Sequence, residues 1–391
     1  MQLVLDIELI TNEVCWMLKK CSESQDLLNF NRNIFIEVFN KILPFAIEVK
    51  IFDQKENNLR SGNKNRRCYD HAINHPIGYI TQALITFMIS KSDRKYSDES
   101  LSFTEHFNNL LESVKNKDCN IYVKVILTCQ LYAIYILIPE WTKSHIIPLL
   151  SWKNNKQDTY QYWYPYLSYN LTVSKNLVQD IKADLLLSFD NLECFTNQQT
   201  RTNLIHLAIL LWREEAITLE NISSKLTETQ DQADAVLFFE CRIGSSKNKE
   251  TIEEEYTAFK ELLKEFTKTK EPVDSELSYW IIRILLTTPC NIYQKEWDHF
   301  WSSKIGYVKD ASNILFITDQ ILNMDSGYKV FNLWQKPEFL LKILNKILDP
   351  NFNYIGELGN ILKKAKSILS ENNLGDNTDY INLNEIYTKC R

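Results

Sequence analysis

The sequence predicts an all-α protein in which helix pairs stack into an irregular HEAT-like array, an α-solenoid. The 391 residues contain 8 glycines and 9 prolines, which are few for a fold that needs glycine at sheet turns and phosphate loops. Apolar residues recur at helical spacing in most segments. Helix pairs of roughly 40 residues follow one another without an exact repeat, as they do in HEAT-type proteins.

The N-terminal region predicts two helices, over residues 3–22 and 26–49. Apolar residues recur at four-residue spacing between Phe30 and Ile42 and form a stripe that a neighbouring helix can cover. Residues 53–68 follow as the most polar run of the chain and are expected to form a loop.

The next helix is expected to begin at Pro76, because proline in the first helical turn lacks only an N–H that would be unpaired anyway. A side chain at Asn74 or His75 can cap this helix. Gly78 is small enough to let a neighbouring helix approach closely. A charged loop over 91–100 then precedes a helix near 101–115.

An eighteen-residue apolar run from Ile121 to Ile138 is expected to form one helix, buried on nearly every side and ending at Pro139. Lys124, Thr128 and Gln130 interrupt the run, so we expect a core helix rather than a membrane span. A tight corner and an aromatic-rich helix should follow.

The remaining helices are expected near 170–189, 199–214, 218–240, 250–268, 275–288, 310–323, 337–348 and 354–370. The polar stretch between residues 245 and 250 suggests a break, which would divide the chain into N-terminal (1–245) and C-terminal (250–391) helical arrays. One continuous solenoid is the alternative.

The cysteines and the charge bear on the compartment. Nine cysteines are scattered without any CxxC pair, and the net charge is −6. An odd count of dispersed cysteines and an N-terminus that reads as an amphipathic helix favour a reducing cytoplasm.

Residues able to perform chemistry are sparse. His71 and His75 are four residues apart, but no glutamate lies between them and Pro76 follows directly, so we expect neither a metal site nor a cofactor. No sequence motif of an enzyme is present, and the prediction is a non-catalytic protein. A hydrolase centred on Asp70, His71 and His75 is an alternative.

A second alternative is a nucleic-acid-binding module that uses a basic loop over residues 60–67. Such a loop is more often simply solvated, and the acidic net charge does not favour nucleic acid as a partner. The residues concerned are Arg60, Lys64, Arg66 and Arg67.

Two stretches carry a resemblance to a known family. The first contains Asp70, His71, Asn74, His75, Pro76 and Gly78, and the second contains Trp141, His145, Pro148, Trp152 and Trp163. Both resemble signatures of a helical region in large bacterial anti-phage defence proteins, where it often follows a sirtuin-like NAD-cleaving domain.

The resemblance implies a sensing or regulatory module that binds a protein partner, either a phage component or an effector. In such proteins the NAD-cleaving activity belongs to the sirtuin-like domain, and this chain lacks the glycines of a Rossmann-type sheet. The family motifs therefore imply interaction residues rather than catalytic ones.

Overall fold

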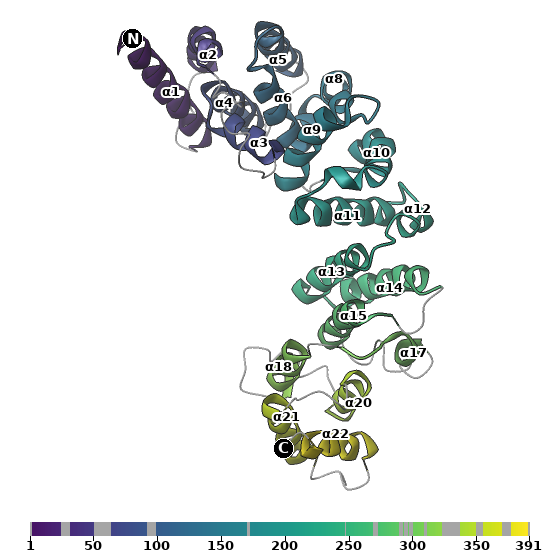
Figure 1. Cartoon of the computed structure of the whole chain (residues 1–391). Helices are drawn as coiled ribbons and strands as arrows, with labels where there is room; N and C mark the ends of the chain where they lie inside the picture. Colours follow the sequence, from purple (N-terminus) through teal and green to yellow (C-terminus); the bar gives the residue numbers. More distant parts are fainter. Residues whose placement is uncertain are drawn as a thin grey trace. The chain divides into compact units, whose positions relative to one another are not determined.

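The computed structural model (Figure 1) describes the following residues: 2–24, 32–50, 64–91, 99–169, 173–246, 248–268, 273–288, 292, 296, 300–308, 311–322, 337–348, 355–369 and 377–389. Within these ranges the regular structure is entirely helical and no strand occurs. The all-α prediction is confirmed.

The chain divides into two compact units, Met1–Ile217 and Thr218–Arg391. This division differs from the break expected between residues 245 and 250. The helices on either side of that stretch, Thr229–Ser245 and Lys249–Phe266, pack against each other inside the second unit. The polar stretch between residues 245 and 250 therefore connects two packed helices within one unit.

The helices of the first unit are α1 (Gln2–Glu23), α2 (Arg32–Glu48), α3 (Lys64–Asn74), α4 (Pro76–Lys91), α5 (Glu99–Val114), α6 (Asn120–Cys129), α7 (Leu131–Leu137), α8 (Pro139–His145), η2 (Ile147–Leu150), α9 (Lys156–Tyr169), α10 (Lys175–Phe189), η3 (Leu192–Cys194) and α11 (Gln198–Arg213). Helix α1 packs along α4 and α2, while α6 packs against α3, α4 and α9. Phe35 of α2 stacks on Phe87 of α4 with ring centroids 4.1 Å apart. The core of this unit therefore lies between α1, α2 and α4 and between α6 and the helices α3, α4 and α9.

The apolar run from Ile121 to Ile138 does not form one helix, and that prediction is wrong. It forms α6 and α7, which bend by 78° across Gln130. The hydroxyl of Thr128 donates to the carbonyl oxygens of Lys124 and Val125, a pattern that bends helices. Gln130 leaves the helical region with φ −103° and ψ 20°.

The polar run 53–68 is also not a loop throughout. Its end belongs to α3, which begins at Lys64. Cys68, Tyr69 and Ala72 provide the buried face that holds this helix on the core. Residues 53–63 lie outside the described residues.

Helix α11 ends in a Schellman motif near the end of the first unit. The N–H of Ala216 donates to the Leu211 carbonyl and the N–H of Glu215 donates to the Trp212 carbonyl, both at 2.9 Å. The motif requires a left-handed residue, and Glu215 adopts φ 57° in place of the usual glycine.

The helices of the second unit are α12 (Leu219–Ser223), α13 (Thr229–Ser245), α14 (Lys249–Phe266), α15 (Ser275–Thr287), α17 (Ser302–Lys304), α18 (Ser312–Leu322), α20 (Pro337–Ile347), α21 (Ile355–Leu369) and α22 (Thr378–Lys389). The expected helix over 218–240 is two helices. Thr218 caps the short α12 through a reciprocal bond with Asn221, and α12 ends at Ser223 before α13 begins at Thr229. Helix α22 lies in a tail with little apolar pattern and was not predicted.

Two fully buried aromatic residues of the second unit, Phe259 and Trp301, stack with ring centroids 5.6 Å apart. Helix α13 packs on α14 and α15, and α18 packs on α21. Packing in this unit, as in the first, also joins helices that are not consecutive in the chain, such as α13 with α15 and α18 with α21.

None of the described helices is by itself long and apolar enough to span a membrane. Helices α6 and α7 reach the required length and apolarity when taken together, and the 78° bend separates them.

Candidate functional site

The first resemblance motif folds into the junction between α3 and α4. Helix α3 ends at Asn74, His75 leaves the helix, and α4 begins at Pro76, as expected for a proline in the first turn. Pro76 has no N–H for the carbonyl four residues earlier, so the two helices cannot continue as one.

The turn between the two helices is tight because Gly78 has no side chain. A Cβ built at Gly78 would lie 1.6 Å from the carbonyl oxygen of Ala72. The close approach expected at this glycine is therefore one between its Cα and the backbone of α3. No other residue type fits here without moving a helix.

The ring of His75, at the junction of α3 and α4, bonds to the first turn of α4 and to the segment after α2. Its Nδ1 accepts a hydrogen bond from the N–H of Ile77 at 3.2 Å, which caps the first turn of α4. That bond leaves the proton on Nε2, which donates to the carbonyl oxygen of Val49 at 3.3 Å, just beyond the end of α2. Both ring nitrogens are therefore occupied by the backbone.

Burial sets the charge of this histidine. The side chain of His75 is 7% exposed. Burial lowers the pKa of its imidazole to about 4, although hydrogen bonds to the carbonyls of Val49 and Lys50 oppose the shift. The neutral ring agrees with Nδ1 acting as an acceptor.

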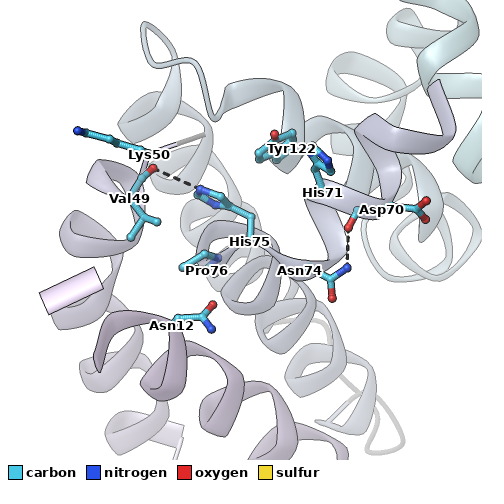
Figure 2. Close-up of a pocket in the computed structure, with 9 residues that line it drawn as sticks. All are labelled: Asn12, Val49, Lys50, Asp70, His71, Asn74, His75, Pro76 and Tyr122. Carbon is cyan, nitrogen blue, oxygen red and sulfur yellow. Dashed lines mark hydrogen bonds between the residues drawn. The ribbon is translucent and has the colours of Figure 1, made fainter. Parts of the chain in front are cut away.

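A cavity of about 530 Å³ opens beside this ring. Its lining comes from α1, the segment after α2, α3, the start of α4, and α6, all within the first unit. The lining residues are Asn12, Val49, Lys50, Asp70, His71, Asn74, His75, Pro76 and Tyr122. In Figure 2, His75 and Pro76 lie between Val49 on one side and Tyr122 and Asn74 on the other.

Asn74 and Asp70, two further residues of the motif, also line the cavity. Asn74 donates through Nδ2 to the carbonyl oxygen of Asp70 at 2.7 Å. Figure 2 shows the Asp70 carboxylate directed away from His75. Because Nδ1 of His75 already accepts from the backbone, this ring has no lone pair for a general base. His75 in this geometry is therefore not placed to act as the general base of the hydrolase alternative.

Among the described residues, no group of three or more His, Cys, Asp and Glu side chains is placed to hold a metal ion. The cavity wall contains instead the ring of Tyr122, which is 1% exposed and 5.2 Å from the His75 ring between centroids. Burial raises the pKa of the Tyr122 hydroxyl, and the nearby thiols of Cys68 and Cys119 add to this. The His75 and Tyr122 rings are therefore uncharged at neutral pH, and the lining also includes the charged residues Lys50 and Asp70.

The second motif forms a separate aromatic cluster. Trp141, on α8, stacks on Phe107 and on His145, with centroids 4.9 Å and 4.7 Å away. Its Nε1 donates to the side-chain oxygen of Asn108 at 2.7 Å, and Nδ1 of His145 donates to its carbonyl at 2.9 Å. These contacts join α8 to α5.

The other two tryptophans of this motif anchor the corner around Pro148. Trp163 is fully buried and donates to the carbonyl of Leu150 at 2.9 Å. Trp152 donates to the hydroxyl of Ser188 at 2.8 Å. Pro148 lies in the first turn of η2. The indole N–H groups of Trp141, Trp152 and Trp163 are thus all used within the fold.

The basic residues are not brought into this site by any described contact. Lys64, Arg66 and Arg67 lie on the first turn of α3, a helix rather than the expected loop. Arg60 and the side chains of these three residues lie outside the described part of the structure.

Four residues of the cavity were not singled out from the sequence. Asn12, Val49, Lys50 and Tyr122 come from three other segments, and each looks ordinary in its own helix or helix end. No local signal could have found them, because only packing of α1, α2 and α6 brings them to His75.

Comparison of the chain with protein-family models, with curated proteins and with solved structures finds no match. The resemblance to the anti-phage defence region therefore stays a prediction, carried by the two motifs alone.

Proposed function

We propose that this chain is a non-catalytic helical scaffold that binds a protein partner and serves as a sensing or regulatory module. The motif tryptophans are consistent with this, since their side chains hold helices together rather than line a reaction chamber. We further propose that the helices stack as a HEAT-like solenoid, in which each helix pair contacts its sequence neighbours. The packing of α1 on α2 and α4, and of α13 on α14 and α15, supports this arrangement within each unit.

The observation that carries the proposal is an apolar face on α1. Leu9, Ile10, Trp16 and Met17 are 61%, 62%, 43% and 56% exposed. At 100° per residue these four positions fall on one side of the helix. Thr11, Cys15, Leu18 and Ser22 are buried on the other side. We call the four exposed residues the α1 apolar face.

This composition suits a protein interface. Tryptophan and methionine are enriched in such interfaces, and a contiguous exposed apolar patch marks a site of interaction. The resemblance suggests two kinds of partner, a phage component and an effector protein such as a sirtuin-like NAD-cleaving enzyme. Binding at one end of a stack of helix pairs can shift the packing of the pairs that follow.

The experiment is co-purification of the full chain with candidate effectors and phage proteins, followed by size-exclusion chromatography. The double variant Trp16→Glu/Met17→Glu should abolish the complex, because two charges would have to be buried in the interface. Phe316→Glu is the matched control, since Phe316 is similarly exposed at 55% in the second unit. This control should retain the complex.

A complex that forms equally well with the double variant would contradict the role of the α1 apolar face. A doubling of the mass of the chain alone, lost in the double variant, would show self-association instead of a foreign partner. Failure of both partner classes to bind would count against the proposed function itself.

A further inference from the structure

We propose that a cavity at the start of α15 binds an organic cation, an alkyl chain ending in an ammonium group, which is the chemistry of a lysine side chain or of a free diamine. The cavity has a volume of about 760 Å³, in the range of small-molecule pockets. It lies entirely in the second unit and is lined by the first residues of α13, α15 and α18. The site is separate from the α1 apolar face, which belongs to the first unit.

Two adjacent aromatic residues of α15 form one wall of this cavity. The rings of Tyr279 and Trp280 are inclined by 79° with their centroids 5.1 Å apart, so they meet at a corner. Both residues are partly exposed and therefore leave aromatic surface for a ligand. The face of an aromatic ring carries negative charge density and attracts cations, tryptophan most strongly.

The same two rings already contact one cation of the protein. The guanidinium carbon of Arg283 lies 5.7 Å from the Tyr279 centroid and 5.1 Å from the Trp280 centroid. Arg283 follows the rings along α15 and does not line the cavity, whereas Glu276 precedes them and does. Glu240 pairs with Arg283 at 2.8 Å and offsets its charge. The rings thus hold a neutralised cation towards the C-terminal end of α15 and border the cavity towards its start.

The charges of the lining have one sign. Asp274 and Glu276 both line the cavity, no described lysine or arginine does so, and neither carboxylate forms an ion pair with a described residue. The Asp274 carboxylate is held in a fixed position: one oxygen accepts from the Thr229 hydroxyl at 2.8 Å, and the other accepts from the N–H groups of Glu276 and Leu277 at 3.0 Å. These bonds leave lone pairs for a further donor.

An ammonium group on an alkyl chain suits this combination better than a metal ion does. No group of three or more His, Cys, Asp and Glu side chains among the described residues is placed to hold a metal, and Ca²⁺ takes roughly six to eight oxygen ligands. An alkylammonium instead donates N–H groups to the carboxylates while its methylene chain packs on the aromatic rings.

The test is ¹⁹F NMR of the full chain labelled with 5-fluorotryptophan, in which Trp280→Phe assigns the Trp280 signal. The probes are N-acetyl-lysine methyl amide and putrescine. Each should shift the Trp280 signal with a Kd of about 5 mM, the strength of exposed cation–π and ion-pair contacts. N-acetyl-norleucine methyl amide, which has an alkyl chain without the charge, should cause no shift at the same concentration.

The double variant Asp274→Asn/Glu276→Gln should weaken binding by about fivefold. It should remain folded, because asparagine also caps helices. Glu250→Gln is the matched control, since Glu250 is exposed and occupies on α14 the position that Glu276 has on α15, two residues after the capping side chain. This control should bind like the wild type.

An unchanged Trp280 signal with both cations, an equal shift with the norleucine derivative, or undiminished binding in the double variant would overturn the proposal. Tighter binding of putrescine would support the site with a free diamine as its ligand. Tighter binding of the lysine derivative would support it with a protein side chain as its ligand.

Discussion

The carbonyl oxygen of Ala72 lies in the space that a side chain at Gly78 would occupy, 1.6 Å from the position of its Cβ. This contact holds the end of α3 against the first turn of α4, and it fixes the angle at which the two helices meet. The cavity beside His75 depends on that angle, since α3 and α4 both contribute to its lining.

The first prediction concerns this glycine. Gly78→Ala should lower the free energy of unfolding by about 3 kcal/mol, because the methyl group collides with backbone that cannot rotate away. Gly244, near the end of α13, is the matched control, since nothing lies within 4 Å of a Cβ there. Gly244→Ala should be neutral or stabilise by less than about 1 kcal/mol. Urea titrations of both variants measure the difference, and equal effects would contradict the close contact.

The second prediction is a pH dependence from His75. The folded pKa of about 4 lies below the ordinary value of 6.5, so the unfolded chain binds the proton first as the pH falls. The contribution of His75 is complete above pH 6.5 and is lost between pH 6.5 and 4. Its loss amounts to about 3 kcal/mol. Protonation also removes the lone pair that accepts the Ile77 N–H.

The comparison for this effect is His75→Asn, which keeps a capping side chain but does not titrate. The stability advantage of the wild type over this variant, measured by urea titration, should shrink steadily from pH 7 to pH 4. The carboxyl groups titrate alike in both proteins and cancel in the difference. A constant difference across this range would show that His75 is not buried as a neutral ring.

Where a segment has one apolar face, the sequence predicted it well. The helix expected over 250–268 is found as Lys249–Phe266, since its charged residues mark the solvent side. The run 121–138 lacked such a face. Its apolar residues continue on every side, so periodicity could not reveal that the chain turns at Gln130. The start of α3 was expected to be a loop because residues 64–67 are all polar. The buried residues that hold this helix, Cys68, Tyr69 and Ala72, come after them.

The candidate site likewise contains some residues that the sequence pointed to and others that it did not. Its segment from Asp70 to Gly78 stood out because histidine, proline and glycine at a helix junction each impose a local constraint. Tyr122 was hidden within an apolar run, and Asn12 was one polar residue among many on an amphipathic helix. Their part in the site arises from the packing of α1 and α6 around α4, which a single sequence does not encode locally.

The third prediction has the opposite sign to the first. Glu215 occupies the left-handed position of the Schellman motif that ends α11, at φ 57°. A side chain in this region costs about 1 kcal/mol relative to glycine. Glu215→Gly should therefore raise the free energy of unfolding by about that amount. Glu214→Gly, at the preceding position with φ −86°, should gain nothing. Stabilisation by both variants would place the effect elsewhere than in the left-handed residue.

The fourth prediction concerns the buried hydrogen-bond chain of the second unit. Trp301, which is fully buried, donates through Nε1 to the hydroxyl of Tyr256 at 2.9 Å. That hydroxyl in turn donates to Glu296 at 2.9 Å, and Glu296 pairs with Lys260. Burial and the Glu296 carboxylate raise the pKa of the Tyr256 hydroxyl, which keeps its proton for this bond.

Tyr256→Phe leaves the Trp301 N–H buried without its acceptor and removes one donor from Glu296. Stability should fall by about 2 kcal/mol, since an unsatisfied buried donor bears its full desolvation cost. Tyr307→Phe, at a tyrosine that is 57% exposed, should change stability by less than about 0.5 kcal/mol. Combining Tyr256→Phe with Trp301→Phe tests the link directly, because the second substitution removes the stranded donor. The double variant should then be more stable than the sum of the two single effects, and strict additivity would show that the two side chains do not share this bond.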